Sequence, residues 1–213
     1  MSCGKKKCHY QVYNWVIPAT FSPANDTFSI GDTITVTSIF DENVYNKYIG
    51  TNNKLVNYNF EPACLLLQID SIPPSEKELV GKLSNYATLI VDSVHVFYLL
   101  NDYRGFEIAS GYYSNWDNAY RLTYKLVLKK KGLFLFNHYS TLFESGYGGQ
   151  EFEERCANSD VRASVNLNNG SSNNIEMLHD GYDTYEGGYI EFILRDTQKL
   201  FRDKGGYVFY VKE

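Results

Sequence analysis

The segment that decides the fold is YRLTYKLVLK, residues 120–129. Apolar or aromatic side chains occupy every even position from 120 to 128, whereas the odd positions are mainly charged or hydroxylated. Successive side chains of a β-strand point to opposite faces of a sheet, so this alternation predicts a strand with one buried face. Lys130-Lys131-Gly132 follows as a turn, and LFLF at 133–136 is expected to return as the antiparallel partner.

Other segments carry related signals. Alternation predicts strands at 33–40, 63–70, 189–194 and 207–211, and one long or two short strands at 87–100. Residues 43–60 are expected to form a long loop, with one weak strand as the alternative, and short helices are expected at 75–83 and 196–202. Many short strands with turn clusters between them predict a mainly β chain: an Ig-like, Greek-key β-sandwich with a few short helices.

The chain is long enough to bury a large core without a metal. We expect residues 1–9 to be a flexible tether and residues 10–213 to form one β-rich body, with a weak boundary near residue 145. The net charge of −5 argues against nucleic acid as a partner, because such binding needs a concentrated basic surface. The lysine run at 129–131 fits an exposed turn better than an anion site.

The first ten residues, MSCGKKKCHY, suggest where the protein resides. Ser2-Cys3-Gly4 looks like the acylation site of a bacterial lipoprotein, in which a small residue precedes the lipidated cysteine, and Lys5-Lys6-Lys7 would begin a polar tether. With Gly31-Asp32-Thr33 and the Lys131-Gly132 turn, the chain resembles lipoproteins of unknown function from Bacteroidota. That resemblance implies lipidation of Cys3 and a periplasmic or outer-membrane location in the cell envelope, and it implies no activity.

Two alternatives to lipidation remain open. The N-terminus could be that of a cytoplasmic protein with reduced cysteines. Cys3, Cys8 and His9 could also bind a metal, but no second ligand pair with zinc-site spacing accompanies them.

The remaining cysteines bear on the same question. If Cys3 is acylated, three are left, and Cys64 and Cys156 in the folded body are the expected disulfide pair in an oxidising compartment. The alternative is that both are buried free thiols.

No motif in the chain indicates a catalytic activity. The sequence lacks G-x-S-x-G, a phosphate-binding glycine loop and any clustering of its four histidines, so no catalytic residue is assigned. Asp180, Asp183 and Glu186 lie within one acidic loop and could supply the oxygen ligands that Ca²⁺ prefers, although the EF-hand pattern is absent. A plain acidic loop explains the same residues.

The aromatic stretch at 111–120 suggests a glycan site. Tyr112, Tyr113 and Trp116 lie among asparagine and aspartate, and aromatic faces stack on sugar rings while amides bind hydroxyl groups. The alternative is a turn whose aromatic rings cover the edge of the core. We therefore expect a non-catalytic envelope module that binds a glycan or a protein, or builds structure. A carbohydrate-active hydrolase, with paired carboxylates that spacing alone does not reveal, is the alternative.

Overall fold

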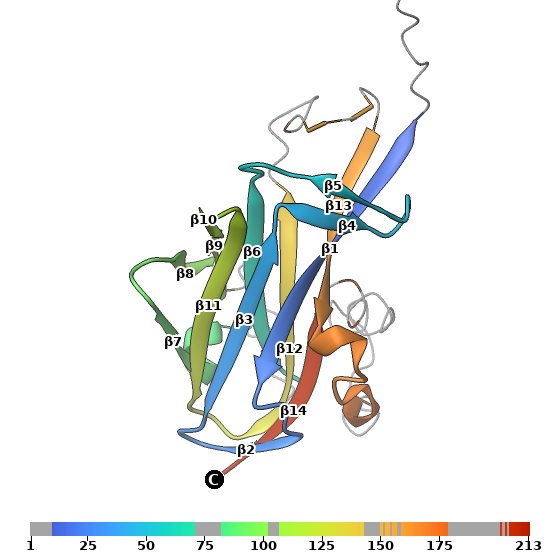
Figure 1. The fold of residues 1–213 in the computed structure, drawn as a ribbon. Coiled ribbons are helices and arrows are strands. Elements are labelled where there is room, and N and C mark those ends of the chain that lie inside the picture. Colours follow the sequence, from blue (N-terminus) through green and yellow to red (C-terminus); the bar gives the residue numbers. More distant parts are fainter. Residues whose placement is uncertain are drawn as a thin grey trace, which may run out of the picture.

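The computed structural model consists of two β-sheets packed face to face (Figure 1). It describes residues 10–70, 82–101, 107–142, 150, 152–153, 155–156, 159–178, 201, 203 and 205–213. The two-sheet β-sandwich confirms the predicted fold class. Within the described residues, no helix has the length and apolar character needed to cross a membrane.

The first sheet has eight strands in the order β10-β11-β3-β1-β4-β5, with β13 beside β1 and β7 beside β11. Their bounds are β1 Gln11–Ser22, β3 Thr33–Asp41, β4 Asn43–Asn46, β5 Thr51–Lys54, β7 Ala87–Val91, β10 Ser114–Trp116, β11 Ala119–Leu128 and β13 Ser159–Leu167. The strand β13 runs parallel to β1, and the other pairs of this sheet are antiparallel.

The second sheet has six strands in the order β2-β14-β12-β6-β9-β8. Their bounds are β2 Thr27–Ser29, β6 Phe60–Gln68, β8 Val96–Asn101, β9 Glu107–Tyr112, β12 Gly132–Leu142 and β14 Gly206–Lys212. The described helices are short: α1 covers Leu83–Tyr86, and a 3-10 turn covers Asn168–Gly170.

Strand β11 behaves as its sequence predicts. Its even-numbered side chains are buried, while Lys125 on the other face is exposed. Strand β3 shows the same division, with Ile34 and Val36 fully buried. The core between the sheets is largely aromatic, and its fully buried side chains include Tyr13, Trp15, Phe21, Phe60, Tyr120, Tyr124, Phe134, Phe136, Tyr207 and Phe209.

The expected hairpin between 120–129 and 133–136 is wrong. Strand β12 pairs with β6 and β14 in the second sheet, so the chain crosses from one sheet to the other at the lysine turn. Gly132 has a φ of +142°, and a Cβ there would collide with the Gln68 side chain. The reason for the crossing is that β12 is apolar on both faces: Phe134 and Phe136 enter the core between the sheets, while Leu133 and Leu135 enter a second cluster behind the sheet.

Other expectations have mixed outcomes. Residues 87–100 do form two strands, β7 and β8, which lie in different sheets. The loop expected at 43–60 instead contains the hairpin β4–β5. Strands β1 and β13 form at 11–22 and 159–167, where the sequence pattern predicts no strand. The expected strand at 189–194, most of the two helices and the boundary near 145 lie outside the described residues.

The buried Asn46 side chain connects the β4–β5 hairpin to β1 through hydrogen bonds. The side-chain oxygen of Asn46 accepts backbone N–H groups of Asn14 (3.3 Å) and Tyr48 (3.1 Å), and its amide donates to the Asn53 side chain (3.2 Å). Asn53 Oδ1 also accepts the Trp15 indole N–H at 3.1 Å. Asn14, Trp15, Asn46 and Asn53 are buried, so each of their polar groups would cost free energy if left without a partner.

We predict that Asn46→Ala lowers the free energy of unfolding by roughly 2–4 kcal/mol. The substitution leaves the buried Asn14 N–H without its acceptor, removes the acceptor of the part-buried Tyr48 N–H and breaks the buried hydrogen bond to Asn53. The matched control is Asn52→Ala in the same hairpin, where the side chain is exposed and a change within about 0.5 kcal/mol is expected. Urea unfolding monitored by tryptophan fluorescence measures both. Equal unfolding midpoints for the two variants would contradict this role of Asn46.

Candidate binding surface

Exposed hydrophobic side chains gather where the chain twice crosses between the sheets. The strand β7 belongs to the first sheet and β8 to the second, and the chain returns from β9 to β10 beside that crossing (Figure 1). Five large exposed hydrophobic residues of this stretch form what we call the aromatic surface: Val94, Val96, Tyr98, Tyr112 and Trp116. Leu99 is exposed as well, but it lies opposite Ala109 and projects to the other face of β8. Such a concentration on one side of a molecule is typical of an interaction site.

A tight turn positions Trp116. Asp117 and Asn118 connect β10 to β11 with positive φ angles of 53° and 56°, as in the two-residue turns that join antiparallel strands. This register places Trp116 near Arg121, whose guanidinium lies 5.5 Å from the centre of the indole ring. Trp116 remains 42% exposed despite this contact.

His95 connects the segment between β7 and β8 to strand β10. Its imidazole lies nearly parallel to the Trp116 indole, with ring centres 6.1 Å apart, and its Nδ1 is 3.0 Å from the Ser114 hydroxyl. That hydroxyl donates to the Val94 carbonyl at 2.6 Å. Partial burial lowers the pKa of His95, and the Asp92 carboxylate opposes the shift. The imidazole is therefore mainly neutral at pH 7 and acts as a packing partner for the indole.

The surface continues from His95 along β8. Val96 lies directly opposite Tyr112 on β9, and Tyr98 lies opposite Ser110. Residues opposite each other in a ladder project to the same face, so the exposed Val96 and Tyr112 side chains form a pair beside the His95–Trp116 contact. The two pairs are linked along the chain, because Val96 directly follows His95.

The three aromatic residues proposed for a glycan site differ in their exposure to solvent. Tyr112 and Trp116 are exposed, as that role requires. Tyr113 is 9% exposed, its hydroxyl lies 3.2 Å from the Ser38 hydroxyl, and burial raises its pKa. Tyr113 therefore belongs to the core and its inclusion in the site is wrong, because side chains alternate in direction along an extended chain.

The residues that support Trp116 were not predicted from the sequence. Val96 and Tyr98 lie in a stretch whose strands were predicted, but their exposure follows from the position of β8 at the edge of its sheet. Arg121 was expected to point away from the core, and its place between two buried neighbours of β11 agrees with this expectation. Its contact with Trp116 depends on the β10–β11 register, for which Asp117-Asn118 was the available signal.

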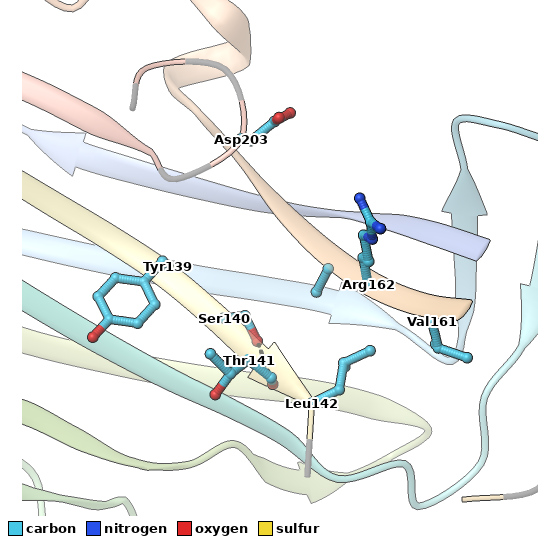
Figure 2. Close-up of a pocket in the computed structure, with 8 residues that line it drawn as sticks. Tyr139, Ser140, Thr141, Leu142, Val161, Arg162 and Asp203 are labelled. Atoms are coloured by element: carbon cyan, nitrogen blue, oxygen red, sulfur yellow. Dashed lines mark hydrogen bonds between the residues drawn. The ribbon is translucent and has the colours of Figure 1, made fainter. Parts of the chain in front are cut away.

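A second candidate is a groove between β12 and β13, with a volume of about 540 Å³ (Figure 2). Its lining comprises Tyr139–Leu142, Val161–Ala163 and Asp203. Arg162 donates to Asp160 at 2.8 Å, and Lys47 donates to Asp203 at 2.7 Å, so the charged groups at the rim are already paired. Among the described lining residues Asp203 is the single carboxylate, which gives no support to hydrolysis by two facing carboxylates.

The buried polar groups at the centre of the core also lack access to a substrate. Tyr124 forms hydrogen bonds with Cys64 and, at 3.2 Å, with the Nδ1 of His138. All three residues are at most 1% exposed. Burial raises the pKa of the Cys64 thiol to about 12 and lowers the pKa of His138 to about 4, while the Ala63 backbone partly opposes the latter shift. The thiol is protonated and the imidazole neutral at pH 7, so neither is prepared for catalysis.

The expected disulfide between Cys64 and Cys156 is wrong. Cys64 is free and buried, whereas Cys156 is disulfide-bonded. The physical reason is position: Cys64 lies opposite His138 in the second sheet, inside the core, while the Cys156 sulfur lies 3.4 Å from the Gln11 side-chain oxygen at the start of β1.

The other predicted sites fall outside the described residues. These are Cys3, the Cys3–Cys8–His9 metal alternative, and the calcium candidates Asp180, Asp183 and Glu186. Within the described ranges, no cluster of histidine, cysteine, aspartate and glutamate side chains could hold a metal ion.

No protein-family model matches the sequence, and no curated protein is similar to it. Among solved structures, the human F-spondin reeler domain shares 7% identity and a TM-score of 0.33, over 76% of this chain and 93% of that one. A type II cohesin dyad from the adaptor ScaA scaffoldin of Acetivibrio cellulolyticus shares 13% identity and a TM-score of 0.29, over 70% and 46%. A non-cellulosomal cohesin from Archaeoglobus fulgidus shares 12% identity and a TM-score of 0.24, over 80% and 99%. At these identities and TM-scores, the likeness carries no argument about function.

We predict that acid weakens the fold through His138. In the unfolded chain histidine binds a proton near pH 6.5, whereas His138 in the fold does so only near pH 4. As pH falls from 6.5 to 4, the unfolded state gains a proton that the folded state does not, and the free energy of unfolding decreases by up to about 3 kcal/mol. Above pH 6.5 the imidazole is neutral in both states, so it no longer makes the free energy of unfolding depend on pH.

Urea unfolding at a series of pH values measures the effect. His138→Gln retains a hydrogen-bonding side chain but does not titrate, so its stability should vary less between pH 4 and 6.5 than that of the wild type. His95→Gln, at a partly exposed position, is the control and should keep most of the wild-type dependence. Parallel curves for the wild type and His138→Gln would show that another group titrates.

Proposed function

We propose that this protein is a non-catalytic, carbohydrate-binding β-sandwich module of the bacterial cell envelope. It is anchored through an acylated Cys3 and binds glycan at the aromatic surface. The observation that carries the binding role is the exposed Trp116, which Arg121 and His95 hold in place. The exposed Val96–Tyr112 pair begins one residue after His95. An anchored module with a fixed aromatic platform can retain a polymer at the cell surface without altering it.

The support of Trp116 favours binding because it fixes the ring before a ligand arrives. The cation–π contact with Arg121 and the parallel His95 ring restrict the indole, so less side-chain entropy is lost when a ligand stacks on its exposed part. A platform fixed in advance is typical of sites that recognise flat, weakly hydrophobic ligands such as sugar rings.

Polar groups flank the aromatic platform. Asn115 donates to the side chain of Asn57 at 3.2 Å, and Asp117 and Asn118 form the exposed turn next to Trp116. Amide and carboxylate groups beside an aromatic ring match the alternating hydroxyl and C–H surfaces of a sugar. A partner protein would be served as well by the apolar part of the surface, but this polar border favours the glycan.

Two observations support an envelope location. Disulfides persist in oxidising compartments such as the periplasm, and Cys156 is disulfide-bonded. Ser2-Cys3-Gly4 supplies the small-residue–cysteine arrangement of an acylation site, and the lysines that follow suit a position next to anionic headgroups.

We predict that Trp116→Ala lowers affinity for the bound oligosaccharide at least tenfold and that Tyr112→Ala weakens it less. An array of bacterial and plant oligosaccharides identifies the best ligand, and calorimetric titration measures the variants. Tyr45→Ala is the matched control, because Tyr45 is similarly exposed on β4 and away from the aromatic surface. The affinity of Tyr45→Ala for the oligosaccharide should stay within about twofold of the wild-type affinity. Absence of binding to every oligosaccharide, or unchanged affinity for Trp116→Ala, would contradict the proposal.

We predict that Cys3→Ala moves the protein from the membrane to the soluble fraction. Each buried acyl methylene contributes about 0.8 kcal/mol, so two or three chains hold a protein at a membrane in effect permanently. The precursor is expressed behind a lipoprotein signal, and cells are fractionated for the wild type, Cys3→Ala and the control Cys8→Ala. The wild type and Cys8→Ala should stay in the membrane fraction. Equal solubility of the wild type and Cys3→Ala would refute the anchor.

A further inference from the structure

The Arg121 side chain carries a positive charge that pairs with no carboxylate among the described residues. Its guanidinium carbon lies 5.5 Å from the centre of the Trp116 ring, and within the described part of the chain the group forms neither a hydrogen bond nor an ion pair. The Nε atom of Arg121 is buried without a hydrogen-bond partner. Buried donors normally have one, so packing against the indole does not fully account for this arginine.

The strand register places Arg121 and Trp116 on the same face of the first sheet. The strands β10, β11 and β3 lie side by side (Figure 1). Arg121 lies opposite Ser114 on β10 and Ile39 on β3, while Trp116 lies opposite Ala119. Because Ser114 and Trp116 are two residues apart on one strand, their side chains project to the same face. The guanidinium and the exposed indole are therefore diagonal neighbours that open to the same side.

The charged end of Arg121 is accessible. The residue is half-buried, and its terminal Nη atoms, unlike Nε, are not buried. Partial burial has already removed part of the hydration of this cation. An anion that accepts hydrogen bonds from the two Nη groups would replace that lost hydration, and little further desolvation of the arginine would be needed.

The acidic residues around the aromatic surface limit which anion can bind. Asp41 lies one row along the sheet and accepts the Asn43 N–H at 2.6 Å, Asp117 lies in the turn after β10, and Asp92 follows β7. These carboxylates disfavour a dense polyanion spread over the whole surface, because like charges repel. The expected ligand therefore presents a single anionic group to Arg121.

We propose that Trp116 and Arg121 together bind an acidic sugar unit of the uronic acid class. The indole stacks on the sugar ring, and the guanidinium donates two parallel hydrogen bonds to its carboxylate, whose planar shape matches the arginine fork. The separation of 5.5 Å between the guanidinium carbon and the indole centre is about the width of one sugar unit, so one unit can contact both groups. This assignment rests on the glycan binding proposed above and specifies the chemistry of the ligand.

Matched pairs of ligands test the assignment. Tetramers of galacturonate, mannuronate and guluronate, each as the free acid and as the neutral methyl ester, are titrated into the wild-type protein by calorimetry. At least one acid should bind about tenfold or more tightly than its own ester, because only the acid forms charge-assisted hydrogen bonds. If no acid binds better than its ester while a neutral oligosaccharide binds, the acidic ligand is refuted and the proposed glycan binding stands. Absence of binding to every oligosaccharide refutes both.

Variants locate the carboxylate at Arg121. Arg121→Gln should weaken binding of the acid about tenfold and leave binding of the ester within about threefold. Arg121→Lys keeps the charge but lacks the fork, so it should lose most of the same affinity. Lys125→Gln is the matched control, because it removes an exposed charge four residues away on the same face of β11 and should change neither affinity by more than about twofold.

Two results with these variants would overturn the assignment. Equal losses for acid and ester in Arg121→Gln would show that Arg121 only positions the indole. An equal loss of acid binding in Lys125→Gln and Arg121→Gln would show a general effect of charge without a specific contact. Urea unfolding of each variant checks that its fold is retained.

Discussion

The parallel pairing of β1 with β13 is the contact on which the rest of the molecule depends. It joins residues 11–19 to residues 159–167 and so connects an early and a late segment of the sequence within one sheet. Beyond Ala19 the same strand changes its neighbour and pairs with β3 at residues 20–22. Pro18 lies just before this change; it has no N–H to donate, and its carbonyl accepts the Ser38 hydroxyl at 2.7 Å. One strand thereby organises both halves of the first sheet.

The strands with one buried face could be read from the sequence. In β3 and β11 the inward side chains are apolar and the outward ones polar, and this pattern is a local property. In β12 both faces are buried, so its run of apolar residues shows that a strand exists but not which strands flank it. Strand β1 does alternate, with Tyr13, Trp15 and Ile17 inward, but Pro18 interrupts the pattern and the parallel partner lies 148 residues away.

The candidate site was predictable to a similar extent. The cluster of aromatic side chains near Trp116 was visible in the sequence, and the exposure of Trp116 and Tyr112 agrees with a binding role. The burial of Tyr113 could have been derived only from the point at which the chain passes from β9 to β10. That Cys64 and Cys156 do not pair likewise follows from their separate positions in the fold, and the spacing of cysteines along the chain does not contain that information.

The parallel pairing also determines when the molecule can fold. A ribosome or a secretion channel releases β1 early, but its β13 neighbour follows only after more than 130 further residues. Throughout that interval the inward row of Tyr13, Trp15 and Ile17 lacks one of its neighbouring strands, and the first sheet cannot be completed. Contacts between residues so far apart in sequence slow folding, because a long loop must close before any stabilisation is gained. The order of synthesis therefore delays completion of the first sheet until residues 159–167 are available, whatever the other strands have formed by then.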